Sequence, residues 1–180
     1  MLAQSEKGLQ QSEGTILKSE NLGNNWSLIF SGTIYDLNAI FFINENTGYA
    51  GGDGFNGYNI LKTTNGGQYW YKQRFVNNST EISSIYFLDS NVGFAAGSVC
   101  LFKTTDNGLN WNLYTPLFNG ALNDIKFINA STGYIVGGGI YKTTNTGLYW
   151  SLIDSSYSFY NLQFVDTQVK NEAILCLSCQ

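Results

Sequence analysis

The chain has 180 residues, 43% of them hydrophobic and 16% aromatic, which is enough to bury one core but argues against two independent domains. A net charge of −4, with nine Lys and Arg residues that never cluster, excludes a nucleic-acid surface. Histidine is absent, so the commonest metal ligand and general base are missing, and we expect neither a cofactor nor a metal site.

Short strands follow one another along the chain after an N-terminal extension, residues 1–13. β-branched and aromatic residues alternate with polar ones in short runs, and this period of two predicts strands. Residues 14–30 hold the first two strands. Residues 37–76 are predicted to hold four, at about 37–43, 48–52, 58–64 and 69–75.

The repeat has a length typical of β-propeller blades. The pattern of four strands returns in 82–118 and 121–154, and residues 158–178 hold two more. The four tryptophans are 44, 41 and 39 residues apart, within the range of propeller repeats. We therefore predict an all-β fold, a single β-propeller domain over 14–180 with four-stranded antiparallel blades and a half-blade at each end.

A nine-residue segment ends at each tryptophan: KSENLGNNW, KTTNGGQYW, KTTDNGLNW and KTTNTGLYW. We name these segments tryptophan turns. The Asn or Asp is expected to accept hydrogen bonds from amides two or three residues on, the Gly to adopt positive φ, and the Trp to bury its ring against the next blade. The predicted structural residues are Ser19, Asn21, Gly23, Trp26, Thr63, Asn65, Gly67, Trp70, Thr104, Asp106, Gly108, Trp111, Thr143, Asn145, Gly147 and Trp150.

The tryptophan turn resembles the Asp-box, or bacterial neuraminidase repeat, with Asn in place of Asp in three copies. Together with the FINENTGYAGG segment that precedes Asp53, it makes residues 14–165 similar to the photosystem II stability and assembly factor family, more than to sialidases. That resemblance implies a non-catalytic, extracytoplasmic scaffold, periplasmic or secreted, that binds another protein. The first residues show no signal peptide, and no apolar run approaches the ~18 residues of a membrane helix, so we expect no membrane insertion.

Function in a propeller resides in what is not repeated, mainly in loops. The connection between the second and third strands is longest in the first complete repeat, where it reads GGDGFNGYN. The alternative to a recognition loop is a longer hairpin that packs on itself. The candidate partner-binding residues are Asp53, Phe55, Asn56, Tyr58 and the chain's one arginine, Arg74.

Recurring lysines and scattered cysteines carry no site in this interpretation. Lys62, Lys103 and Lys142 open the tryptophan turns and are predicted to be solubilising charges on edge strands. Cys100 lies in an apolar run. Cys176 and Cys179 form a lone C-x-x-C, which cannot complete a zinc site by itself.

Two classes of enzyme also carry Asp-boxes. Sialidases hold their substrate carboxylate with three arginines, and this chain has one. Xyloglucan-cleaving glycosidases use two carboxylates across a cleft between two propellers. Asp36, Asp53, Asp124 and Asp154 could face a groove, but the chain is too short for a second propeller. We expect no enzyme, and the alternative is a fragment or relative of an Asp-box glycoside hydrolase or glycan-binding propeller.

The two half-blades leave three arrangements open. The chain is part of a larger ring, completes a ring by self-association with a second copy, or closes a four-blade ring by pairing its own ends. An open arc is expected to expose apolar residues of the last half-blade, among them Phe159, Leu162 and Phe164.

Overall fold

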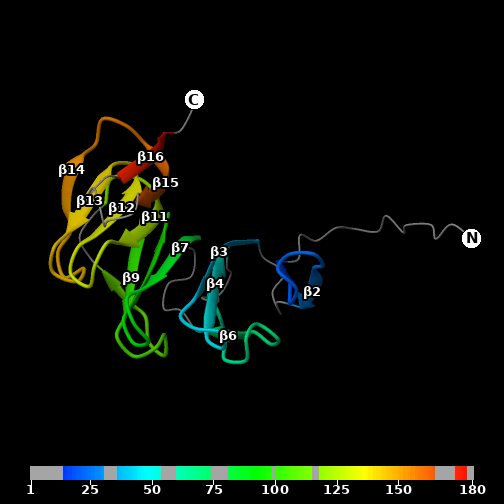
Figure 1. Ribbon diagram of the computed structural model, residues 1–180. Helices are drawn as coiled ribbons and strands as arrows, with labels where there is room; N and C mark the ends of the chain where they lie inside the picture. The colour runs from blue at the N-terminus through cyan, green and yellow to red at the C-terminus, as the bar shows by residue number, and fades with distance from the viewer. Residues whose placement is uncertain are drawn as a thin grey trace, which may run out of the picture.

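The computed structural model describes residues 14–30, 36–53, 60–73, 81–98, 100–114, 118–164 and 173–177. Within these ranges the chain forms sixteen β-strands and no helix. The strands make three four-stranded sheets and two two-stranded ones, all antiparallel (Figure 1). The predicted all-β class with four-stranded blades is confirmed.

Each sheet is a meander in which strands that are neighbours in sequence pair in space. The first pair is β1 (Thr15–Lys18) with β2 (Ser27–Phe30), and the last is β15 (Phe159–Phe164) with β16 (Ala173–Leu177). The complete sheets are β3 (Leu37–Phe42), β4 (Gly48–Gly52), β5 (Ile60–Thr63) and β6 (Tyr71–Gln73); β7 (Ile82–Phe87), β8 (Gly93–Gly97), β9 (Cys100–Thr104) and β10 (Asn112–Tyr114); and β11 (Leu122–Phe127), β12 (Gly133–Gly137), β13 (Ile140–Thr143) and β14 (Ser151–Asp154).

The second strands are rich in glycine because their backbone lies against other groups at both ends. A Cβ on Gly93 would lie 2.5 Å from the ring of Phe87, so the first glycine of β8 makes room for that side chain. A Cβ on Gly97 would collide with the backbone carbonyl of Glu81. The other complete sheets repeat both contacts, which gives the recurring Gly-aromatic-x-x-Gly pattern its physical reason.

The core lies between consecutive sheets. One cluster joins Tyr49 and Ile60 of the first complete sheet to Ile85 and Phe102 of the second. The next cluster joins Phe94 of the second sheet to side chains of the third. The sheets thus pack face to face in chain order, and their first strands, β3, β7, β11 and β15, lie next to one another.

The blades form an open arc in which β1–β2 and β15–β16 lie at opposite ends (Figure 1). These two half-blades form separate sheets and do not pair, so the closed four-blade ring is not the arrangement observed.

The prediction that the last half-blade exposes its apolar residues is wrong. Phe159 and Leu162 are buried against Val136 of the preceding sheet, and the half-buried Phe164 ring lies 5.5 Å from that of Tyr134. These side chains are covered because β15, the first strand of its blade, packs its apolar face against the preceding blade.

Candidate functional site

The tryptophan turn is held by its own hydroxyl and carboxamide or carboxylate. Thr63 Oγ1 accepts a hydrogen bond from the Gly67 amide at 3.0 Å and donates one to Asn65 Oδ1 at 3.0 Å. Asn65 Oδ1 in turn accepts a hydrogen bond from the amide of Tyr69 at 3.0 Å. The amide it binds is therefore four residues on, not two or three as predicted, because the Thr63 hydroxyl binds the amide two residues on and the Asn65 backbone carbonyl accepts from the amide three residues on.

The other three turns repeat this geometry. The hydroxyl accepts from the glycine amide at 2.8 to 3.0 Å, and Oδ1 of the Asn or Asp accepts from the amide four residues on at 2.8 to 2.9 Å. The predicted glycines all have positive φ, between 67° and 85°. The residue before each glycine also has positive φ, including Leu22, Asn107 and Thr146 at 57° to 59°. Sequence reasoning missed this second position because its residue type varies among the copies.

Trp111 and Trp150 pack on the preceding blade. The Trp111 ring meets Tyr49 of the earlier sheet and Phe87 of its own, edge to face, at centroid distances of 6.3 and 5.8 Å. Trp150 repeats both contacts with Phe94 and Phe127 at the same two distances. The prediction that each ring packs on the next blade is therefore wrong in direction. The indole lies on the same face of its sheet as Phe87 of the first strand, and this face packs against the preceding blade.

Two of the lysines that open the tryptophan turns, Lys62 and Lys103, join consecutive blades. Lys62 Nζ donates to the Asn107 carbonyl at 2.6 Å and lies 5.3 Å from the centre of the Tyr49 ring. Lys103 Nζ donates to the Thr146 carbonyl at 2.8 Å. Burial lowers the pKa of both lysines. The prediction of edge-strand charges for Lys62, Lys103 and Lys142 is wrong, because β5, β9 and β13 each have a strand on both sides.

The same carbonyl of Asn107 accepts a hydrogen bond from the Tyr49 hydroxyl at 2.6 Å. Burial, and secondarily the charge of Asp106, raises the pKa of Tyr49, so this phenol stays protonated as a donor. The left-handed residue before the glycine therefore turns its carbonyl toward the preceding blade, where an aromatic hydroxyl and an ammonium group bind it.

Asp53, the first candidate partner-binding residue, lies at the end of the blade opposite the tryptophan turn. The turn lies beside the β3–β4 connection, since the Gly66 amide donates to the Asn46 carbonyl at 2.8 Å, whereas Asp53 follows the other end of β4. Asp53 is exposed there, and its amide donates to the Asp36 carbonyl at 2.9 Å. The remaining candidates, Phe55, Asn56, Tyr58 and Arg74, lie outside the described residues.

Two of the four predicted groove carboxylates are engaged in the fold. Asp124 is 7% exposed and accepts hydrogen bonds from Ser84 Oγ at 2.9 Å and from the Leu162 amide at 3.0 Å, so it joins three first strands. Asp154 accepts from the Ser156 amide at 2.7 Å, and this hydrogen bond lowers the pKa of its carboxyl. Asp36 and Asp53 remain exposed.

Other site classes find no support in the described part of the chain. No group of three or more His, Cys, Asp or Glu side chains there could hold a metal ion. No helix in those ranges is long and apolar enough to cross a membrane.

Comparison with known proteins places the chain among β-propellers. No family model matches, and no curated protein matches. Among solved structures, YCF48 bound to D1 peptide superimposes with a TM-score of 0.60 at 24% identity over 73% of this chain and 45% of that one. YCF48 from Cyanidioschyzon merolae gives 0.63 at 19% identity, over 91% of this chain and 58% of its own. The GH74 enzyme of Niastella koreensis gives 0.66 at 19% identity, over 85% of this chain and 29% of its own.

These similarities establish the fold. The arc of four-stranded sheets is part of a β-propeller. The chain spans from 29% to 58% of the lengths of those three solved structures.

Proposed function

We propose that the chain is a non-catalytic propeller that binds a polypeptide partner through the end of the blades opposite the tryptophan turns. The observation that carries this proposal is the division of side chains between the two ends. At one end recurring side chains such as Thr63, Lys62 and Trp111 make contacts within and between blades. At the other end the unrepeated loop begins at the exposed Asp53.

The finer part of the proposal is a scaffold function like that of photosystem II assembly factor-like proteins. Its support is the Asp-box-like turn together with the neighbour YCF48, whose structure contains a D1 peptide. An aromatic pair on a glycine-rich loop suits an extended peptide, because flat rings bury much area at little entropic cost. An extracytoplasmic location, periplasmic or secreted, belongs to the same proposal.

Binding is tested with the D1 peptide as the first probe and a phage-displayed random peptide library as the second. We expect enriched peptides to lose at least about tenfold in affinity on Phe55→Ala or Tyr58→Ala, as for an aromatic anchor. Tyr149→Ala is the matched control, since Tyr149 is 74% exposed in a tryptophan turn at the other end. A library without enriched peptides, or equal binding by all three variants, would contradict the proposal.

The second candidate is a fragment of a glycoside hydrolase or glycan-binding propeller. The structural similarity to the Niastella koreensis GH74 enzyme favours it, and so do the exposed Asp36 and Asp53 at one end of the blades. Incubation with xyloglucan decides between the two, and we expect no release of reducing sugars. Turnover that disappears on Asp53→Asn would establish the enzyme instead.

A further inference from the structure

The two ends of the arc are uncovered at positions that are buried in the middle of the arc. Trp26 is 61% exposed, whereas Trp70 and Trp111, at the same position of the tryptophan turn, are 9% and 4% exposed. Leu22 is fully exposed, yet it has the same left-handed conformation as Asn107. In Asn107 this conformation directs the backbone carbonyl toward Lys62 of the preceding blade. The first tryptophan turn therefore has the geometry that contacts a preceding blade in the other copies, but its Trp26 and Leu22 are exposed.

The first complete sheet is also exposed on the face that turns toward the first half-blade. Ile40 is 57% exposed, whereas Ile85 and Ile125 at the same place in β7 and β11 are 5% and 1% exposed. Phe42 is 40% exposed, against 5% for Phe87. A pocket of about 230 Å³ lies between β1 and β3, lined by Ile16, Ile40 and their neighbours. The first two strands of a blade would cover all of these side chains.

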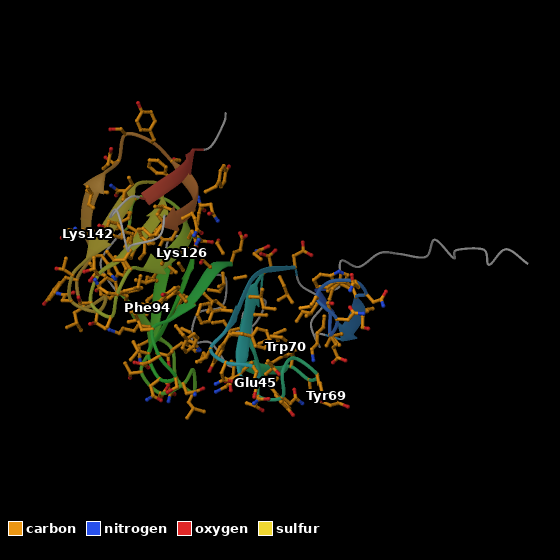
Figure 2. The ribbon with its side chains drawn as sticks, viewed as in Figure 1. Glu45, Tyr69, Trp70, Phe94, Lys126 and Lys142 are labelled. Atoms are coloured by element: carbon orange, nitrogen blue, oxygen red, sulfur yellow. The ribbon has the colours of Figure 1, made fainter. Side chains whose placement is uncertain are left out.

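The other end of the arc carries the complementary surface. Lys142 Nζ lies 5.5 Å from the centre of the Tyr134 ring. Lys62 lies over the Tyr49 ring in the same way, and its ammonium group also donates to a carbonyl of the next tryptophan turn. In Figure 2, Lys142 and Trp70 lie in parts of the molecule separated along the arc. Tyr134 also packs on Phe164, and these two rings correspond to the pair that receives Trp111.

The edge strands of the two half-blades match as well. β1 and β2 are the third and fourth strands of a blade, because the first tryptophan turn joins them, and among the described strands β1 pairs with β2 alone. β15 and β16 are the first and second strands of a blade, and within the same described ranges β16 pairs with β15 alone. Pairing β16 with β1 would make a four-stranded sheet like the other three.

We propose that the chain associates head to tail with a second copy of itself, the hairpin β15–β16 of one copy joining β1–β2 of the other in one hybrid blade. In that blade Trp26 packs on the partner's Tyr134 and the partner's Phe164, and the partner's Lys142 donates to the Leu22 carbonyl. Two copies closed in this way would make eight blades, within the usual four to eight. This inference is independent of peptide binding, which uses the opposite end of the blades.

The test is the mass of the chain in solution, measured by analytical ultracentrifugation over a concentration series. We expect the wild-type chain to associate, and Trp26→Ala and Lys142→Ala each to weaken association, the tryptophan change by about 30-fold or more, as for a buried interface anchor. Each variant keeps one intact end, so a mixture of the two should form a dimer that neither forms alone.

Two controls keep the test decisive. Tyr149→Ala removes an exposed aromatic ring from the tryptophan turn of the last complete blade, and this variant should associate like the wild type. Ile40→Asp places a charge on the uncovered face without touching the turn and should also prevent association, and circular dichroism checks that each variant is folded. A monomeric wild type, unchanged association of Trp26→Ala, or a mixture that stays monomeric would each overturn the proposal.

Discussion

Replacing Trp111 by alanine is expected to lower the free energy of unfolding by about 3–5 kcal/mol, the range for large aromatic side chains truncated in a core. The ring is 4% exposed and meets Tyr49 and Phe87 edge to face at centroid distances of 6.3 and 5.8 Å. Each aromatic pair contributes about 0.5–1.5 kcal/mol beyond area burial, so the two pairs account for about 1–3 kcal/mol. The buried area and the cavity left behind supply the rest.

The matched variant is Trp26→Ala, which makes the same substitution in the same turn without a preceding blade. Because Trp26 is 61% exposed, we expect it to cost less than about 1 kcal/mol in dilute solution. Urea unfolding followed by far-ultraviolet circular dichroism measures both variants, since removing a tryptophan alters fluorescence directly. Equal losses in the two variants would refute the reasoning, because the indole would then act within its own turn and not between blades.

Three further predictions concern the second complete blade, each measured by urea unfolding. Thr104→Val removes the acceptor of the Gly108 amide, so we expect a loss of about 1–3 kcal/mol, whereas Thr104→Ser keeps the hydroxyl and should lose less. Gly108→Ala places a Cβ 2.7 Å from the Tyr49 ring at φ +70°, and should cost more than Gly120→Ala, which has φ +80° but no atom nearer than 3.4 Å; equal costs would mean that backbone strain alone decides. Hydrogen bonds from Asn110 lower the pKa of Asp106, so its contribution is present above the unfolded pKa of 3.8 and is lost as pH falls through the folded pKa. Asp106→Asn should therefore flatten the loss of stability as pH falls from above 3.8 through the folded pKa, and an unchanged slope would contradict this.

Local chemistry in the sequence determined the strands and their turns. The period of two predicted β3 to within a residue, because alternation reflects which face of a strand is buried. The tryptophan turn was predicted as a clamp because Thr63, Asn65 and Gly67 are close in sequence and satisfy one another. Contacts of this kind need no knowledge of the rest of the chain.

Relations between blades were decided by the tertiary structure. Lys62 looks like a surface charge in the sequence, and only the adjacent blade brings the Asn107 carbonyl to 2.6 Å from its ammonium group. Asp124 looked like a free carboxylate, yet it joins residues about 40 positions away on either side. The direction predicted from the sequence for the packing of Trp111 is also wrong. A repeated sequence pattern is the same whether each copy packs on the earlier copy or on the later one.

The sequence by itself determined what each nine-residue turn does internally, since its donors and acceptors lie within four residues of one another. Only the tertiary structure decided which faces are covered, because burial depends on the neighbouring blade. That is why the same tryptophan is a core residue at position 111 and an exposed one at position 26.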